Sequence, residues 1–352
     1  MVAGAAVAGL LSLAAGCGVA ASQQVINARP AAAHEAIQPA AGEGNLGGLR
    51  LTSRPRKPGK PHGKSVPTAG NALFGGNGLL VREQGALGRT LAMVRVYYHI
   101  GGTFPQVSDR RNMAQGSTEL ISLDSAGTSY ASIAAGSKDG SILAFLRSVN
   151  QAALQYHLGA IYISFEHEPD GPQHAALGSA AEFVRAWDHV HQLAVAAHLD
   201  WNQGGRLHWV LILIHTAYQN GGAGAYWPGS GEADIVAADG YNSYRCGNQA
   251  QTQIQTPAML FNPLLAFAAA HGGLPVFIAE FGSDTSTPNA QPRFIEQMQA
   301  YLASNRQIAA ALYWDDAGPS CSYRVDGHPA ALAALAALGR SAMMQGRALQ
   351  AS

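Results

Sequence analysis

Beyond about residue 70, short apolar runs alternate along the chain with longer segments of amphipathic pattern. Runs such as VLILI at 210–214 are continuously apolar, which is typical of parallel β-strands covered on both faces. We expect eight strands, at 72–75, 92–98, 119–124, 160–165, 208–214, 235–239, 276–280 and 310–314. The first strand is the least defined, because Gly75 and Gly76 suit a loop equally well.

The segments between these runs repeat apolar residues at helical spacing. Phe183, Trp187 and Val190 follow one another at i, i+4 and i+7, and similar patterns occupy 142–149 and 294–301. Asp139 or Ser141 is available to cap the helix over 142–149. The alternation over about 270 residues predicts a single (β/α)8 barrel over 71–340, followed by a C-terminal tail at 341–352. A doubly wound sheet would share this alternation.

Polar and aromatic residues gather directly after the strand runs, at 98–99, 166–168, 239–242, 280 and 314–316. In a barrel the carboxyl ends of all strands meet on one face, where active sites of that fold lie, whereas a doubly wound sheet would scatter them. The placement therefore favours the barrel. It also sets Glu168 and Glu280 across one mouth from each other.

Glu168 and Glu280 form the candidate catalytic pair. Glycoside hydrolysis needs one protonated carboxyl to assist the leaving oxygen and one ionised carboxylate to meet the oxocarbenium-like carbon. Different surroundings can separate the pKa values of two carboxyls and so divide these roles between them. The pair, in this strand context, points to a glycosidase.

The chain begins with an apolar run at 2–16 that is too short to span a bilayer and has the length of a signal-peptide core. The stretch LAAGC at 13–17 resembles a bacterial lipobox, although no Lys or Arg precedes the run. This resemblance implies cleavage before Cys17, lipidation of Cys17, and an extracellular protein anchored to the cell membrane. Free secretion is the alternative.

Residues 17–70 are rich in Ala, Gly and Pro and are expected to form a flexible linker. The segment 50–64 holds six basic residues and no acidic one, which suits contact with an anionic cell-surface polymer or lipid, or simply a solvated linker. The whole chain has 22 basic and 22 acidic residues, which argues against a nucleic-acid binder. Residues 1–69 carry seven basic and two acidic residues, so the remainder has a net charge of −5.

Three motifs resemble glycoside hydrolase family 26, a group of retaining (β/α)8 enzymes that includes β-mannanases and some β-glucanases and β-xylanases. They are ISFEHEPDG at 163–171, ADIVAADGYN at 233–242 and PVFIAEFGS at 275–283, in the family's order. The resemblance covers roughly residues 72–335. Family members of the mannanase kind carry tryptophans soon after the His-Glu pair, where this chain reads PDGPQHAALG. That difference puts mannan as the substrate in doubt.

The resemblance implies a role for each matching residue. Glu168 would be the general acid/base and Glu280 the nucleophile. His167 would hydrogen-bond substrate or Glu280, Tyr241 would donate its phenol to the nucleophile, and Trp314 would be an aromatic floor for a sugar ring.

The resemblance also makes Arg95, on the second expected strand, a weaker candidate for holding the nucleophile anionic. The strand ends add Tyr98, Asp239 and Asn242 as candidates for substrate contact. We expect no metal and no cofactor, because the HEPDG run lacks the second His of a zinc motif.

Three cysteines remain to be assigned. If Cys17 is lipidated, Cys246 and Cys321 are left for each other. Both follow strands at the active-site face, so a disulfide is plausible in an exported protein.

The function we expect is retaining hydrolysis of β-glycosidic bonds in a poly- or oligosaccharide. One alternative is a catalytically silent carbohydrate-binding lipoprotein, and another is a cell-wall structural module on the same barrel. Retention of both Glu168 and Glu280 favours the enzyme, because a binder does not need the pair.

Overall fold

The computed structural model describes residues 71–246, 251–317 and 321–348. The expected signal peptide, the lipidation site Cys17 and the basic linker segment at 50–64 lie outside these residues. Among the helices of the described part, none is long and apolar enough to cross a membrane.

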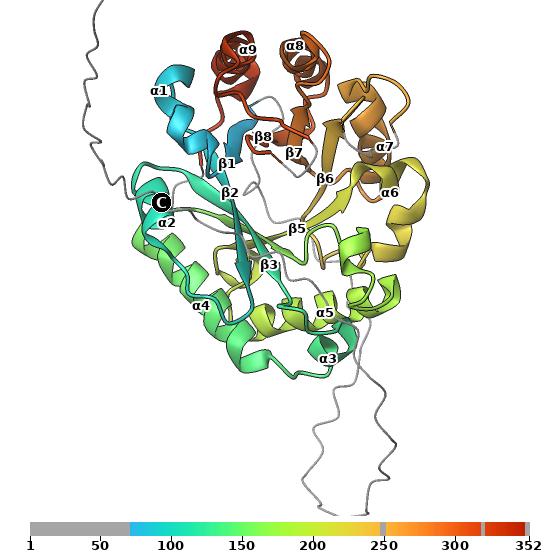
Figure 1. Ribbon diagram of the computed structural model, residues 1–352. Coiled ribbons are helices and arrows are strands. Elements are labelled where there is room, and N and C mark those ends of the chain that lie inside the picture. The colour runs from blue at the N-terminus through green and yellow to red at the C-terminus, as the bar shows by residue number, and fades with distance from the viewer. Residues whose placement is uncertain (1–70, 247–250, 318–320, 349–352) are drawn as a thin grey trace, which may run out of the picture. The chain divides into compact units, whose positions relative to one another are not determined.

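Parallel strands close into a barrel in which each strand pairs with the next along the chain and the eighth pairs with the first (Figure 1). They are β1 (Leu73–Asn77), β2 (Met93–His99), β3 (Thr118–Asp124), β4 (Ile161–Phe165), β5 (Leu207–Ile214), β6 (Ile235–Asn242), β7 (Val276–Ser283) and β8 (Ile308–Tyr313). All eight expected strands are confirmed, and the (β/α)8 barrel with them.

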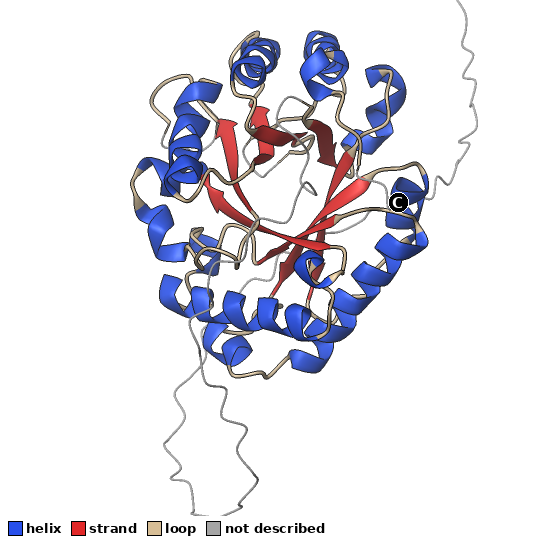
Figure 2. Ribbon diagram, turned by 180° about the vertical axis from the view of Figure 1, so that it is seen from behind, coloured by secondary structure: helices blue, strands red, loops and turns tan. Residues whose placement is uncertain are grey.

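Helices lie around the outside of the barrel and cover the strands (Figure 2). They are α1 (Gln84–Leu87), α2 (Val107–Ala114), α3 (Tyr130–Ala134), α4 (Asp139–Gln155), α5 (Ala180–Ala196), α6 (His215–Gln219), α7 (Pro257–Ala270), α8 (Ala290–Ser304) and α9 (Pro329–Arg340). The expected cap of α4 is wrong: the helix already includes Asp139 and Ser141, and the carboxylate of Asp139 pairs with His189 at 2.7 Å.

The folded unit continues past the boundary expected at residue 340. A short 3-10 turn at Ala342–Met344 follows α9, and Met344 is fully buried. The backbone N–H of Ala72 donates to the carbonyl of Met343 at 2.8 Å, and that of Gly346 donates to Ala72 at 3.1 Å. The first and last described segments therefore lie together at the amino-terminal ends of the strands.

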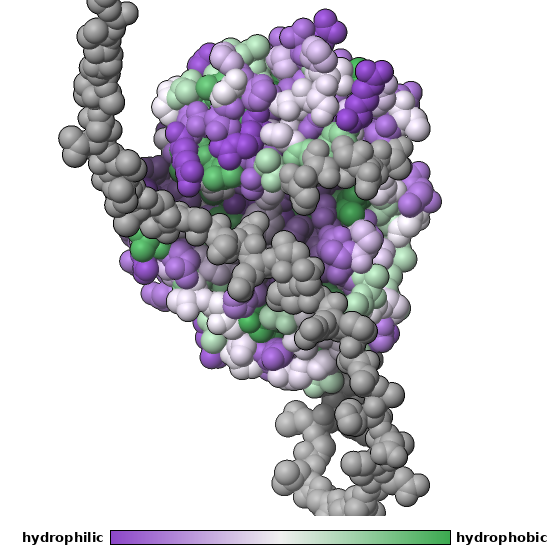
Figure 3. All heavy atoms as spheres, in the orientation of Figure 1, coloured by the Kyte–Doolittle hydropathy of each residue, from purple (hydrophilic) through white to green (hydrophobic). Residues whose placement is uncertain are grey.

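Alternate side chains of the strands divide between two cores. One set fills the barrel interior, among them Leu73, Met93, Leu120, Tyr162, Ile212, Ala237, Phe277 and Leu312. The intervening residues pack outward against the helices in a larger apolar layer. Strand β1 follows this pattern although it contains glycines. Glycine is needed at Gly75, because a side chain there would collide with the carbonyl of Met93. On the surface that Figure 3 leaves uncovered, apolar residues form small areas among polar ones.

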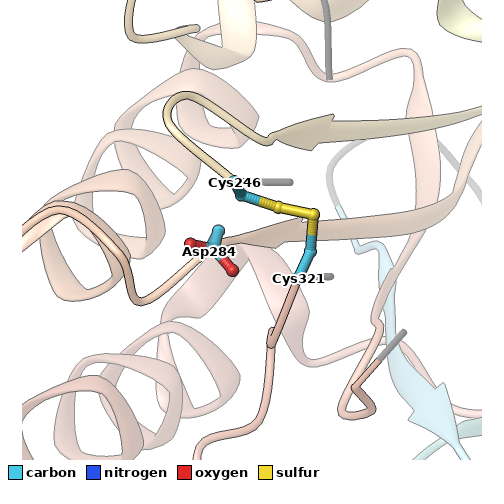
Figure 4. A group of neighbouring side chains, drawn as sticks. All are labelled: Cys246, Asp284 and Cys321. Carbon is cyan, nitrogen blue, oxygen red and sulfur yellow. A yellow bond between two sulfur atoms is a disulfide. The ribbon is translucent and has the colours of Figure 1, made fainter. Parts of the chain in front are cut away.

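Cys246 and Cys321 form the expected disulfide, with Cα atoms 5.3 Å apart. The bond ties the segment after β6 to the segment after β8, beside Asp284 at the end of β7 (Figure 4). Asp284 accepts the backbone N–H of Ser322 at 2.7 Å, which holds the chain next to Cys321. Three segments at the carboxyl ends of neighbouring strands are thus joined.

Replacing both cysteines by serine is expected to lower the free energy of unfolding by about 4 kcal/mol, because the bond closes a loop of 75 residues in the unfolded chain. For a domain of this size that corresponds to roughly 8 °C in the unfolding midpoint. Thermal unfolding of the wild type with and without reductant provides the comparison. A double variant that melts together with the unreduced wild type would contradict this role of the bond.

Candidate active site

Glu280 points into the mouth of the barrel because β7 contains an extra residue. Phe277 packs inside the barrel and Ile278 outside it, so regular alternation would put Ala279 inside and Glu280 outside. The pairing with β6 skips Ala279: Ile278 and Glu280 pair with consecutive residues of that strand. A bulge of this kind changes the direction of the side chains that follow it. Glu280 consequently turns toward the interior, where it is buried.

Both carboxylate oxygens of Glu280 have partners. The phenol of Tyr97, from β2, donates to Oε1, and the phenol of Tyr241, from β6, donates to Oε2. The Nε of Arg95 lies 3.4 Å from Oε1. Two neutral donors and one cation therefore surround the carboxylate form of this side chain.

Arg95 is fully buried below this group, and its guanidinium lies 4.7 Å from the centre of the Tyr97 ring. Burial alone would lower its pKa, but the neighbouring Tyr97, Glu280 and Asp239 raise it above the ordinary value. The arginine thus remains a fixed positive charge beside Glu280.

Glu168 follows β4, and its surroundings disfavour the ionised form of its carboxyl group. Burial raises its pKa to about 8, and the negative charges of Glu280 and Asp170 act in the same direction. Gln173 donates to Oε2 at 3.3 Å, a weak contact that favours the anion only slightly. Near neutral pH this carboxyl is therefore mainly protonated, while hydrogen-bond donors surround the carboxylate of Glu280.

The loop that carries Glu168 is held on both sides. Glu166 and Glu168 both adopt positive φ angles, +50° and +51°, which are uncommon for residues with a side chain. The ring of His174 connects the two: Nε2 lies 3.2 Å from the carboxylate of Glu166 and Nδ1 lies 2.8 Å from the carbonyl of Glu168. The Glu168 N–H also donates to Ile212 on β5 at 2.9 Å. These contacts fix the direction of Glu168.

His167 and Asp239 lie beside the carboxylate of Glu280. One ligand atom from each of the three residues lies within 4.8 Å of the others, a spacing that could hold a metal ion. Burial lowers the pKa of His167 well below its usual value, so the ring is neutral. Burial, Glu280 and Glu168 raise the pKa of Asp239, whose oxygens have no hydrogen-bond partner among the described residues. The fixed charge of Arg95 opposes a cation at this point.

Aromatic side chains line the rest of the mouth. Trp314 follows β8 and meets the ring of Tyr97 edge-on, with centroids 5.8 Å apart. The ring of Tyr241 packs against Tyr323 at 4.7 Å, and Tyr323 in turn packs against the disulfide. The phenol that contacts Glu280 is therefore supported from behind by the covalently joined segments. Trp314 lies among these side chains, and its role as a floor for a sugar ring stays a prediction.

Two expected substrate contacts, Tyr98 and Asn242, are not brought to the site. Tyr98 points outward from β2 between the barrel and its helices, where it packs against Phe145 and donates to the carboxylate of Asp109. Asn242 is buried, and its amide is used by Ser283 and by the backbone N–H of Gln255. Both expectations are wrong for the same reason: each side chain lies on the outer face of its strand.

Tyr97 is the site residue that the sequence analysis missed. Alternation could have identified it, because a strand that turns Arg95 inward also turns the residue two positions later inward. Tyr98 was expected instead, because it ends the strand predicted at 92–98 and directly precedes His99. In the structure β2 continues through both tyrosines to His99.

No protein-family model matches the chain, and no curated protein does. Solved structures do match. A modular endo-β-1,4-mannanase of glycoside hydrolase family 26 from Cellulomonas fimi is 15% identical, with a TM-score of 0.54, over 81% of this chain and 76% of that one. The GH26C protein of a Muricauda species is 12% identical, with a TM-score of 0.57, over 78% and 86% of the two chains.

The catalytic domain of a GH26 endo-β-1,4-mannanase from a Bacillus species is 13% identical, with a TM-score of 0.52, over 78% of this chain and 86% of that one. At identities this low, the structural matches establish a shared fold. The resemblance drawn from the three motifs is thus confirmed at the level of the barrel.

Proposed function

We propose that the chain is a retaining glycoside hydrolase that cleaves β-glycosidic bonds of a poly- or oligosaccharide. The observation that carries the proposal is that two carboxyl groups at the mouth of the barrel have different surroundings. Glu168 has a pKa raised to about 8, whereas Glu280 accepts two phenols and lies beside Arg95. One protonated and one ionised carboxyl are what this reaction requires.

In the first step of the proposed mechanism, a carboxylate oxygen of Glu280 attacks the anomeric carbon. The bond from that carbon to the glycosidic oxygen breaks, and Glu168 gives its proton to the departing oxygen. Each carboxylate oxygen of Glu280 carries two lone pairs and accepts one phenol, so it can attack the sugar while Tyr97 and Tyr241 remain hydrogen-bonded.

In the second step, Glu168 is a carboxylate and removes a proton from water. The water oxygen attacks the anomeric carbon of the glycosyl-enzyme, and the bond to Glu280 breaks. Formation of the glycosyl ester removes the negative charge of Glu280, which is one of the charges that raise the pKa of Glu168, so Glu168 ionises more readily for its role as base in the second step.

The structural neighbours favour a β-mannan as the first substrate to test, because two of those cited are endo-β-1,4-mannanases. The run PDGPQHAALG after Glu168 favours a different or smaller glycan, because it contains none of the tryptophans that would stack on a sugar there. A panel of β-mannan, mixed-linkage β-glucan, xylan and short β-linked oligosaccharides separates these possibilities by reducing-sugar release. Product released initially as the β-anomer supports retention, and release of the α-anomer or no turnover on any glycan would refute the proposal.

Two adjacent tyrosines provide a matched pair of variants. Tyr97→Phe is expected to lower kcat/KM by about 10- to 100-fold, because it removes a hydrogen bond to a charged group. Tyr98→Phe removes an equal hydroxyl from the outer face and should leave kcat/KM unchanged. Steady-state kinetics on the best glycan of the panel tests both. Equal losses in the two variants would show that the assignment of Tyr97 is wrong.

We further propose that the protein is exported and anchored through a lipid on Cys17, with a carbohydrate as its partner in the barrel mouth. The lipobox-like LAAGC run and the disulfide, a bond typical of oxidising compartments, support export. Replacing Cys17 by alanine should move the protein from the membrane fraction to a soluble extracellular fraction. An unchanged membrane fraction would argue against the lipid anchor.

A further inference from the structure

The carboxylate of Glu166, directly after β4, is buried and takes no part in the proposed reaction steps. Its side chain is 1% exposed. The backbone N–H of Ser125 donates to its Oε2 at 2.9 Å, and Nε2 of His174 lies 3.2 Å from its Oε1. A buried carboxylate is costly unless it is paired and hydrogen-bonded. Glu166 is therefore held between the segment after β3 and the segment after β4.

His174 connects this carboxylate to the backbone of Glu168. The residue ends a short 3-10 turn, Pro172–His174. Its Nδ1 lies 2.8 Å from the carbonyl oxygen of Glu168, and Nδ1 carries the hydrogen because a carbonyl can only accept. The backbone N–H of Gly171 donates to the same oxygen at 2.8 Å. Both lone pairs of this carbonyl therefore have a donor.

These contacts hold a backbone conformation that is otherwise unfavourable. Glu166 and Glu168 both have positive φ angles, which residues with a side chain keep only where their surroundings impose them. One imidazole ring closes the segment, because it meets Glu166 at one nitrogen and Glu168 at the other. The side chain of Glu168 leaves the backbone inside this closed segment, so its direction depends on the closure.

The partners of Glu280 come from other parts of the barrel. Arg95 and Tyr97 lie on β2, and Tyr241 lies on β6. None of the three belongs to the segment 166–174. A change at His174 consequently disturbs the proton donor, whereas the two phenols and the guanidinium around the nucleophile stay in place.

We propose that His174 and Glu166 are positioning residues, which together direct the carboxyl of Glu168 at the glycosidic oxygen. This inference rests on the proposed function and adds two residues that act through Glu168. In the first step the proton passes from Glu168 to the departing oxygen, and a displacement of about 1 Å can cost about 10²-fold in rate. The cost arises only where the departing oxygen needs the proton.

His174→Ala tests the proposal with two substrates, the best glycan of the panel and the dinitrophenyl glycoside of the corresponding disaccharide. On the glycan, kcat/KM is expected to fall about 100-fold, because a sugar hydroxyl leaves only with a proton. On the aryl glycoside, kcat/KM should stay near the wild-type value, because dinitrophenolate leaves unprotonated. Equal losses on both substrates would indicate a merely structural role and overturn the proposal, as would full activity on the glycan.

His174→Asn is the conservative variant, because its amide nitrogen takes about the place of Nδ1 and can donate to the carbonyl of Glu168. It should recover most of the activity on the glycan, and a loss as large as that of His174→Ala would contradict the role of this contact. Glu166→Ala should show the same selective loss. The double variant of Glu166→Ala and His174→Ala should lose little more than either single variant, since both act through one connection. Additive losses would overturn that connection.

His189→Ala is the matched control. His189 on α5 contacts the carboxylate of Asp139 on α4 at 2.7 Å, which is another histidine–carboxylate pair but lies among the outer helices. This variant should leave kcat/KM unchanged on both substrates, and thermal unfolding of every variant verifies that it is folded. A wild type that cleaves neither substrate would overturn the proposed function and this inference together. An active wild type with equal losses in His174→Ala and His189→Ala would overturn this inference alone.

Discussion

Glu280→Gln is expected to reduce glycan turnover by about 10⁴-fold or more, which is the scale of losses when an enzyme nucleophile is removed. The amide keeps the shape of the side chain. Its oxygen can accept one of the two phenols of Tyr97 and Tyr241 and its NH2 can donate to the oxygen of the other, so the fold should be retained. It cannot form the glycosyl ester, because its lone pairs are poor nucleophiles and its charge is lost. Initial rates on the best glycan, measured with enough protein to detect a 10⁵-fold loss, give the result.

Glu296→Gln, an exposed position on α8, is the matched control and should retain wild-type kcat. A glycan analogue with a fluoride at the carbon next to the anomeric centre should trap the wild type and leave Glu280→Gln unlabelled, as mass spectrometry can determine. Turnover of the Glu280→Gln protein within tenfold of the wild type would remove Glu280 from the mechanism.

Glu168→Gln should lower kcat/KM by about 10² to 10⁴-fold on natural glycans, which is the usual contribution of general acid catalysis. The size of the loss should depend on the leaving group. An aryl glycoside with an acidic phenol as leaving group needs little protonation, so cleavage of its glycosidic bond should be nearly unaffected. The glycosyl-enzyme should then accumulate, because its hydrolysis still needs Glu168 as the base. A loss of equal size for both kinds of substrate would indicate a structural role for Glu168.

The same residue predicts the pH dependence. The folded-state pKa of Glu168 is raised from 4.5 to about 8, so the acid form predominates below that pH and is lost as the pH rises through it. Activity of the wild type should therefore fall on the alkaline side with a midpoint near 8. In Glu168→Gln this fall should be absent, because no proton is left to lose. A profile between pH 5 and 10 that keeps its alkaline limb in the variant would assign the limb to another group.

Much of the fold could be read from the sequence because each strand is a separate apolar run with its own helical partner. Burial on both faces made runs such as 210–214 visible without knowledge of their neighbours. The mouth was equally predictable, since a barrel places all carboxyl ends of its strands together. Glu168 and Glu280 followed from that rule and from the motifs.

The direction of individual side chains was less predictable, because it depends on the phase of each strand. The extra residue at Ala279 reverses the alternation just before Glu280, and the sequence AEF carries no local mark of it. Tyr98 and Asn242 were chosen for their position at strand ends, although their phase turns them outward. A single register shift decides between these outcomes.

The meeting of Ala72 with Met343 and Gly346 has a practical consequence for handling the protein. Both ends of the described barrel emerge at its base, the face formed by the amino-terminal ends of the strands. A fusion partner, an affinity tag or a solid support can therefore be attached at either end without obstructing the mouth. Immobilised and free protein should then process small glycans at the same rate per molecule. For large polymers, the distance between support and base would set how much substrate each molecule can reach.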